Sequence, residues 1–375
     1  MTVASPTQNS QGECLRPTLR WQRRLQILLG LLWLFDGILQ FQPAMFRPDF
    51  FGMVLNMGPA VPPAWLGDLD GRLEPLLTAH SWGANSIFAS LQILLGVGLL
   101  VRETVRVALA ASVVWALAVW LFGEAAGGIF TEGASALTGA PGAALVYALL
   151  ALLVWPRRSP VESAGCAADQ GILPRPLPYW CWTALWVGTA LLETESLNLR
   201  PRAASDAIAN NNLGGPSWLV SVGHELGRIV GVHGTLFAIS VGMVQALIGL
   251  GVLTSRTRRP ALAAGVVTTV FYGIFGQGFG GIFHSGLLGI FHSGATDPNT
   301  APVVVLLGWV LWPVSVTAPT RGMWGTRPGG PKSVLAHLAA SARRPLESAL
   351  NSSIGICKPV TEFDMGLAQA RVVPR

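Results

Sequence analysis

Long apolar runs dominate the hydrophobic pattern of this chain. A helix needs about 20 mostly apolar residues to cross the hydrocarbon core of a bilayer. The pattern therefore predicts an all-α polytopic membrane protein with eight transmembrane helices. Two of the runs, the fourth and the eighth, are short, and each ends in Trp-Pro, where proline stops helix continuation. The eight runs that reach or approach the required length are 25–41, 82–101, 105–123, 140–156, 179–198, 232–253, 261–283 and 301–316.

Polar segments of different lengths connect these runs. The connections 42–81 and 199–231 are long and rich in Pro, Trp and Asp. Within them, Trp65-Leu66 and Trp218-Leu219 indicate short amphipathic helices that lie at the membrane interface. The tail 317–375 is rich in Pro, Ser, Gly and Arg and has no sustained periodicity, so we expect it to be mostly disordered.

Composition agrees with the hydrophobic pattern. Of the 375 residues, 51% are hydrophobic and 12% are charged, about half the charged fraction of a soluble domain. The formal net charge is +6, but the basic residues stand in short clusters between apolar runs. That distribution sets the orientation of a membrane protein, and it argues against nucleic acid as a partner. The lipid bilayer is the partner that the composition predicts.

The basic residues also predict the orientation of the helices. Arginine and lysine gather on the cytoplasmic side of membrane proteins. Here they precede the first run, fill every second connection and recur in the tail. We therefore place both termini in the cytoplasm, with the protein in the inner or plasma membrane. The opposite connections hold Arg47, Arg72, Arg200, Arg202 and Arg228.

The chain contains an internal duplication. Residues 63–130 match 216–283 at a constant offset of 153 without a gap, and about a third of the positions are identical. An even number of helices in each copy gives both copies the same orientation, so the prediction is two parallel-repeat four-helix bundles. The predicted divisions are a cytoplasmic N-terminal segment 1–20, a first membrane unit 21–158, a cytoplasmic linker 159–178, a second membrane unit 179–316 and the cytoplasmic tail 317–375.

Six ionisable residues are candidates for function, because charged groups are costly inside a membrane. Asp36 interrupts the first run, and Glu124 ends the third, while His80 and His233 open the second and sixth. All are predicted near the outer face. They form an outer-side polar cluster that accepts protons or holds a quinone head group, or else a structural cluster that caps helix ends. The six candidates are Asp36, His80, Glu124, Glu193, Glu195 and His233.

Other motifs favour structural roles. Gln92 and Gln245 lie near mid-membrane, where a buried glutamine forms an interhelical hydrogen bond. The steps Gly123…Gly127 and Gly276…Gly280 mark close helix packing or the exit of the chain from a helix, and less readily a loop that lines a substrate site. His284 and His292 stand in a tandem Gly-Ile-Phe-His-Ser-Gly repeat, and two histidines fall short of a metal site, so no metal is predicted.

The second and sixth runs resemble the DoxX/DoxD-like family of membrane proteins. Segments 92–102 and 245–256 each read as glutamine, a Gly/Leu-rich run and a basic turn, and 28–37 is similar to the first helix of that family. The family usually has glutamate where this chain has Gln92 and Gln245. The resemblance implies a four-helix bundle in each unit and association with quinone-linked sulfur oxidation or with an oxidoreductase complex.

The resulting hypothesis is an integral inner-membrane protein, a DoxX-like subunit associated with a quinone-linked oxidoreductase assembly. Quinone is the cofactor and an oxidoreductase subunit the protein partner that this hypothesis implies. One alternative is a transporter of a small molecule or an ion, with its pathway between the repeats. A second alternative is a structural membrane scaffold without catalysis, whose basic tail recruits partners. The sequence leaves open whether the chain is an enzyme.

Overall fold

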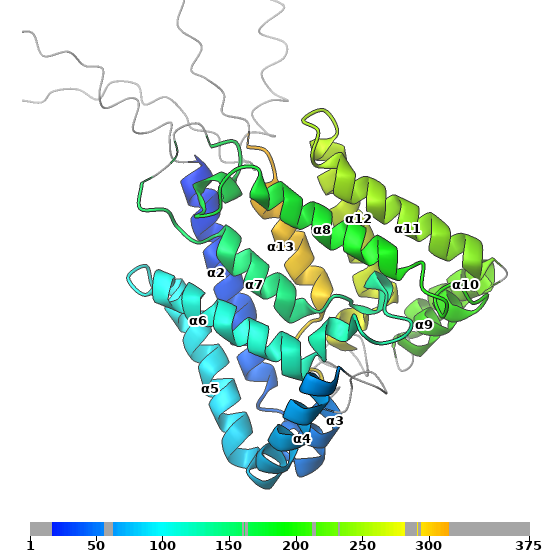
Figure 1. The fold of residues 1–375 in the computed structure, drawn as a ribbon, viewed down its shortest axis with the longest axis horizontal. Coiled ribbons are helices and arrows are strands. Elements are labelled where there is room, and N and C mark those ends of the chain that lie inside the picture. The colour runs from blue at the N-terminus through cyan, green and yellow to red at the C-terminus, as the bar shows by residue number, and fades with distance from the viewer. Residues whose placement is uncertain are drawn as a thin grey trace, which may run out of the picture. The chain divides into compact units, whose positions relative to one another are not determined.

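The computed structural model describes residues 17–55, 63–159, 161, 164–211, 215–231, 233–281, 291 and 294–314. Within these ranges the secondary structure is helical, with twelve α-helices and no β-strand (Figure 1). The all-α prediction is therefore confirmed for this part of the chain. Several predicted features lie outside the described residues, namely the tail 317–375, residues 1–16 of the N-terminal segment, His284 and His292.

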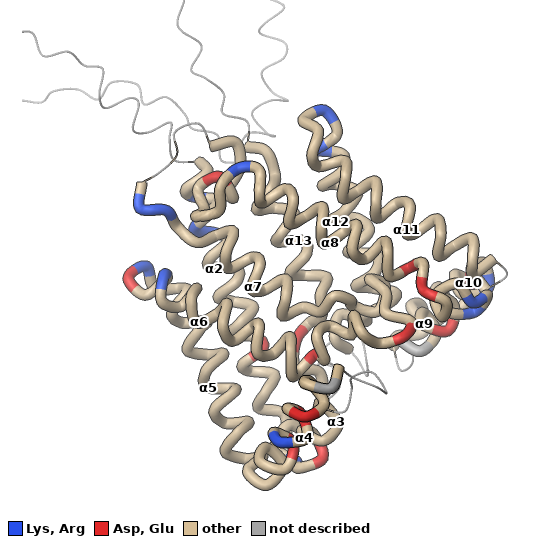
Figure 2. The backbone as a smooth tube through the Cα atoms, in the orientation of Figure 1, with Lys and Arg blue, Asp and Glu red and all other residues tan. Residues whose placement is uncertain are grey.

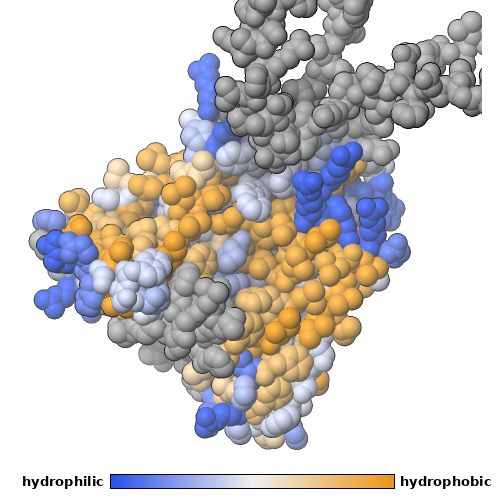
Figure 3. Space-filling view, turned by 180° about the vertical axis from the view of Figure 1, so that it is seen from behind, coloured by the Kyte–Doolittle hydropathy of each residue, from blue (hydrophilic) through white to orange (hydrophobic). Residues whose placement is uncertain are grey.

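Among the described residues, three helices are long and apolar enough to cross a membrane. They are α5 (Ser81–Leu100), α11 (Gly234–Gly251) and α6 (Val105–Ala118) with its π-helical continuation η2 (Val119–Gly123). Their outward side chains are apolar as well: Ile87, Val107 and Leu247 are each more than 60% exposed. Figure 3 shows apolar residues covering a broad part of one face, with polar residues gathered toward its margins. Exposed apolar helices of this length are typical of a membrane protein.

The fourth and eighth predicted runs are shorter helices than the pattern predicts. The run 140–156 is helical at α7 (Ala143–Leu153), and the run 301–316 is helical at α13 (Thr300–Leu311). α7 is about 16 Å long at 1.5 Å per residue. α7 begins late because Gly142, with φ of +98°, precedes it, whereas α13 begins at Thr300 and ends early, because Trp312 is extended and precedes Pro313. α7 and α13 pack against each other and contribute much of the largest buried core.

Three further helices complete the predicted set, and α2 starts earlier than expected. α2 (Pro17–Leu39) includes the end of the segment 1–20 that was predicted to precede it. α8 (Leu177–Leu192) and α12 (Arg258–Phe275) begin two and three residues before their predicted runs, and they end six and eight residues before those runs end. The remaining helices are α3 (Pro48–Leu55), α4 (Ala64–Ala79), α9 (Ala203–Asn211), α10 (Ser217–Gly231), η1 (Pro43–Phe46), η3 (Ala126–Gly128), η4 (Ala136–Thr138), η5 (Ala167–Gln170) and η6 (Gly278–Gly281).

Two helix pairs pack closely through small residues. α2 packs against α5, where a Cβ added to Gly96 would lie 2.7 Å from the carbonyl oxygen of Gly30. α8 packs against α11, where the Thr183 hydroxyl donates a hydrogen bond to the carbonyl oxygen of Gly249 at 2.7 Å. Small residues at these crossings let the two backbones approach, as they do between membrane helices.

The predicted amphipathic segments are the helices α4 and α10. Leu66 and Leu219, each 1% exposed, point inward from their helices, whereas Trp65 and Trp218, each 56% exposed, point outward. One buried leucine beside one exposed tryptophan is the pattern of a helix that lies on an apolar surface with its other face free. Pro63 immediately precedes α4, and Pro216 immediately precedes α10. The carbonyl of each proline accepts the first hydrogen bonds of the helix that follows it.

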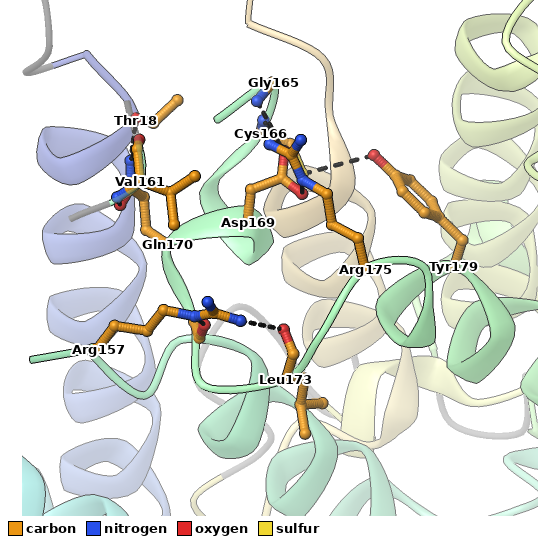
Figure 4. Close-up of polar contacts among 11 residues, drawn as sticks. Thr18, Arg157, Val161, Gly165, Cys166, Asp169, Gln170, Leu173, Arg175 and Tyr179 are labelled. Atoms are coloured by element: carbon orange, nitrogen blue, oxygen red, sulfur yellow. Dashed lines mark hydrogen bonds and ion pairs between the residues drawn. The ribbon is translucent and has the colours of Figure 1, made fainter. Parts of the chain in front are cut away.

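The linker that joins α7 to α8 is folded and contacts the ends of both helices. Figure 4 shows Asp169 at the centre of its contacts, accepting hydrogen bonds from the Gly165 and Cys166 amides and from Arg175, whose Nε lies 2.6 Å from Oδ1. The Gln170 amide donates to the Thr18 hydroxyl at 3.0 Å. This segment therefore holds the start of α2 to the end of α7, and burial raises the pKa of the Cys166 thiol.

Candidate functional site

A cavity of about 730 Å³ lies between α2, α3, α4, α5, α6 and α7. We call it the first cavity. Aromatic and acidic side chains make up much of its wall, and no Lys, Arg or His is among the described residues that line it. The aromatic lining residues are Trp33, Phe50, Phe51, Phe88, Trp115, Phe122 and Tyr147. The acidic lining residues are Asp36, Glu124, Glu132 and Asp297.

A chain of contacts among three helices positions Asp36 on the cavity wall. Its side chain is 3% exposed, and the Tyr147 hydroxyl on α7 donates a hydrogen bond to Oδ2 at 2.7 Å. The Tyr147 ring lies 4.7 Å from the ring of Trp33, one turn before Asp36 on α2. The indole N–H of Trp33 donates to the Ser112 hydroxyl on α6 at 2.7 Å. These contacts join α2, α6 and α7 around the carboxyl group.

Glu124 and Asp297 bring two more carboxyl groups to the same cavity, each from a connection outside the helices. The Glu124 carboxylate accepts hydrogen bonds from the Ala144 amide at 3.0 and 3.2 Å, at the N-terminus of α7 where a negative charge is favourable. Burial, together with the charge of Asp297, raises the pKa of Glu124. Asp297 accepts from the Asn299 amide at 2.6 Å, and burial raises its pKa. Both groups therefore favour a proton or a positive partner.

Several polar atoms of the cavity wall have no hydrogen-bond partner among the residues that the structure describes. Three are acceptors: Asp36 Oδ1, Gln40 Oε1 and Gln92 Oε1, on side chains that are 6% exposed or less. One is a donor, Trp115 Nε1. Buried polar groups are nearly always hydrogen-bonded in native proteins. The predicted interhelical bond of Gln92 is thus not made through its oxygen, and the wall offers acceptors to a ligand.

A smaller cavity of about 160 Å³ contains a polar cluster that is bonded within the protein. We call it the second cavity. Glu193 Oε1 accepts from the Ser135 hydroxyl at 2.6 Å and from the Gln245 amide at 3.2 Å. The same amide donates to the Tyr272 hydroxyl at 2.9 Å. Gln245 therefore makes the interhelical hydrogen bonds expected of it through its amide nitrogen, while its Oε1 has no partner among the described residues.

Each cavity is closed in part by a connection from the other half of the chain. Gly294, Ala295, Thr296 and Asp297, which precede α13, line the first cavity. Gln42 holds this connection, because its amide donates to the Ala295 carbonyl at 2.9 Å and its carbonyl accepts from the Gly294 amide. In the same way, residues 133–138, which precede α7, supply Gly133, Ser135, Leu137 and Thr138 to the second cavity.

The glycine steps predicted after the third and seventh runs are chain exits. Gly127 and Gly280 both have φ of +66° and ψ of 22°, a left-handed conformation that glycine adopts without strain. A Cβ at Gly127 would overlap the carbonyl oxygen of Pro141. Gly127, Gly128 and Gly280 also line the first cavity, so the exit of the helix and the wall of the site are formed by the same turn.

The six predicted candidates separate into three groups in the structure. Asp36 and Glu124 meet at the first cavity, and Glu193 lies at the second. Glu195 accepts a hydrogen bond from the Gly133 amide at 2.6 Å. His80 and His233 are exposed residues that precede α5 and α11, and neither is among the described residues that line a cavity. Depth along a helix predicted the carboxyl pair, but it carried no information on the direction in which each histidine points.

Comparison of the chain with family models, with curated proteins and with solved structures finds no match. Among the described residues, no group of three or more His, Cys, Asp or Glu side chains is arranged to hold a metal ion. Two residues of the first cavity, Tyr147 and Asp297, were missed by the sequence analysis. Tyr147 stands within an apolar run, and Asp297 stands in a connection of the second half, so neither pattern nor proximity in sequence links them to Asp36.

Proposed function

We propose that this chain is an eight-span protein of the inner or plasma membrane, built from two parallel four-helix units similar to the DoxX/DoxD-like family. Contacts that recur 153 residues apart support the repeat. The Thr104 hydroxyl donates to the Gly98 carbonyl, and the Thr257 hydroxyl donates to the Gly251 carbonyl, both at 2.7 Å. The two turns that join α5 to α6 and α11 to α12 are therefore built in the same way.

The fourth helix of each unit is capped in an equivalent manner. Glu124 accepts from the Ala144 amide at the start of α7, and Gln277 accepts from the Ala301 amide at the start of α13, at 3.1 Å. The residue that caps the helix thus recurs at the offset of 153, while α13 follows after a connection four residues longer. Charge supports the orientation with both termini in the cytoplasm: Figure 2 shows basic residues at the α5–α6 and α11–α12 turns and in the linker, toward the same end of these helices.

The proposed activity is the binding of a small molecule in the first cavity, as in a membrane transporter. The observation that carries this proposal is Asp36 Oδ1, a carboxylate oxygen that is buried, lines a cavity of about 730 Å³ and has no partner among the described residues. Ligand pockets of about 300–1,000 Å³ with mostly apolar walls and a few convergent polar groups are typical of small-molecule sites. A purely structural carboxyl group has its hydrogen bonds satisfied, as Glu193 does.

The quinone-linked oxidoreductase subunit is supported less well by this site. A quinone head group presents two carbonyl oxygens, which accept hydrogen bonds. The first cavity offers three unpartnered acceptors on Asp36, Gln40 and Gln92 and one unpartnered donor on Trp115 among its described residues. The acceptors of the wall would face the acceptors of the quinone, so the residues do not fit the group. The scaffold alternative depends on the tail, which lies outside the described residues.

Co-purification tests the proposed function. The protein is purified in mild detergent from the membranes of its native host, and small molecules extracted from it are identified by mass spectrometry. The Ala118→Phe variant places an aromatic ring in the first cavity, because Ala118 lines it on α6. The matched control is Leu247→Phe, since Leu247 is 67% exposed on α11, outside both cavities.

We expect a stoichiometric small molecule in the wild-type and Leu247→Phe preparations and its loss from Ala118→Phe. Thermal unfolding of all three proteins establishes that the loss does not come from unfolding. Identical extracts from the three proteins would contradict the proposal. A stoichiometric redox protein in the same preparations would instead support the hypothesis that the chain is a subunit of an oxidoreductase assembly.

A further inference from the structure

The carboxyl groups of the first cavity have no basic side chain facing them among the described lining residues. Asp36, Glu124 and Asp297 lie around the cavity. An ionised carboxylate in a low-dielectric environment is stable when an opposite charge or strong donors face it. Within the described wall, the Tyr147 hydroxyl donates to Asp36, the Ala144 amide donates to Glu124, and the Asn299 amide and Thr296 hydroxyl donate to Asp297. All of these donors are neutral. A positive charge from a ligand would complete the site.

The unpartnered atoms indicate which hydrogen bonds such a ligand makes. Asp36 Oδ1, Gln40 Oε1 and Gln92 Oε1 are acceptors, and they come from α2, from the turn that follows α2 and from α5. A protonated primary amine carries three donors and no acceptor, and a protonated secondary amine carries two. Either matches a wall whose free atoms are mostly acceptors. A quaternary ammonium group would leave these acceptors unsatisfied.

Aromatic rings stand beside these acceptors. The rings of Trp33 and Tyr147 lie 4.7 Å apart at a tilt of 58°, and the rings of Phe88 and Trp115, on α5 and α6, lie 5.1 Å apart. Aromatic faces attract an ammonium group and also accommodate an apolar substituent. The cavity volume of about 730 Å³ exceeds the need of a bare ion many times over, so most of the space is available to an apolar body.

We propose that the first cavity binds a protonated primary or secondary amine that carries an aromatic or bulky apolar group. The ammonium group lies against Asp36, with Gln40 and Gln92 accepting its remaining hydrogen bonds, and the apolar group lies among the aromatic side chains. This inference rests on the proposed function, because it names the ligand class of the same site. It also accounts for the poor fit of a quinone, which brings acceptors where the wall needs donors.

Calorimetry with two matched probes tests the inference. 2-Phenylethylamine is positively charged at pH 7, and 2-phenylethanol has the same skeleton without the charge. Both are titrated into the full-length protein in the same detergent. We expect the amine to bind at least tenfold more tightly than the alcohol. Equal affinities for the two probes, or tighter binding of the alcohol, would overturn the inference.

Two substitutions and a control locate the charge. Asp36→Asn removes the charge but keeps an acceptor for the Tyr147 hydroxyl, so the fold is retained. We expect it to lower amine affinity at least tenfold and to leave alcohol affinity unchanged. Gln92→Leu removes an unpartnered acceptor and should lower amine affinity several-fold. Glu193→Gln, the matched change at a buried carboxyl group in the second cavity, should alter neither affinity.

An unchanged amine affinity in both Asp36→Asn and Gln92→Leu refutes the assignment, even if the wild type prefers the amine. Failure of 2-phenylethylamine to bind the wild type also refutes the amine. The co-purification experiment then decides the wider question. If the molecule lost from Ala118→Phe is neutral, the proposed function is supported and the amine ligand is refuted. Identical extracts from the three proteins would contradict both the proposed function and the amine ligand.

Discussion

Substitution of Glu124 by glutamine should make the protein more stable at alkaline pH and little changed at acidic pH. Glutamine is the residue that the second half of the chain has at the equivalent position. There Gln277 accepts a hydrogen bond from the Ala301 amide at 3.1 Å. The variant therefore keeps the acceptor for the Ala144 amide at the start of α7 and removes the ionisable group alone.

The magnitude follows from the pKa of Glu124. In the unfolded chain a glutamate titrates near pH 4.3, to within about half a unit. In the folded protein, burial and the nearby Asp297 raise this pKa. Between the two values the folded protein holds a proton that the unfolded chain has released, so stability falls as the pH rises through this window and is constant above it. Each unit of the shift is worth about 1.4 kcal/mol.

Thermal unfolding in detergent at pH 5 and pH 8 measures the effect. We expect Glu124→Gln to exceed the wild type at pH 8 by at least about 1.4 kcal/mol, or about 2–4 °C, and to match it more closely at pH 5. Burial also raises the pKa of Asp297, so part of the pH dependence remains in the variant. Asp49→Asn, at an exposed side chain, is the control. Parallel pH profiles for wild type and variant would refute the reasoning.

Two further predictions concern packing. Gly127→Ala should lower stability by roughly 3 kcal/mol or more, because Gly127 has φ of +66° and a Cβ would overlap the Pro141 carbonyl, whereas Gly83→Ala, which meets nothing within 4 Å, should not. Equal melting temperatures for the two variants would contradict this. Ser135→Ala should cost about 1–3 kcal/mol by removing the 2.6 Å hydrogen bond to the buried Glu193, and an unchanged unfolding curve would show that the bond contributes nothing.

Sequence periodicity predicted the helices well where the apolar run alone determines them. The runs 82–101 and 232–253 correspond closely to α5 and α11, which expose apolar side chains along their length. The apolar pattern overestimated the length of the helices in the runs 140–156 and 301–316. In the first run, residues 140–142 form a turn with a positive φ at Gly142, and in the second run the helix ends at Leu311, because Trp312 is extended and precedes Pro313. A hydropathy pattern counts Gly142 as neutral and Trp312 as part of the apolar run, so it registers neither the turn nor the early helix end.

The candidate site was predicted in part for a related reason. Asp36 and Glu124 stand out in sequence because charges interrupt or end apolar runs. Tyr147 counts as apolar in such a pattern, although its hydroxyl reaches Asp36 across 111 positions of the chain. His80 and Asp36 share a predicted depth, yet a helix of 3.6 residues per turn directs side chains of equal depth to every side. The facing directions come from tertiary packing.

The exchange of connections between the two halves has a consequence for how the chain can be divided. Residues 294–297 close the first cavity and residues 133–138 close the second. A cut in the linker would therefore give two fragments, each missing a wall that the other carries, and only their joint production would restore either pocket. The two pockets also depend on one another, because Gly133 and Thr138 line both cavities, so a substitution in this connection changes both sites together.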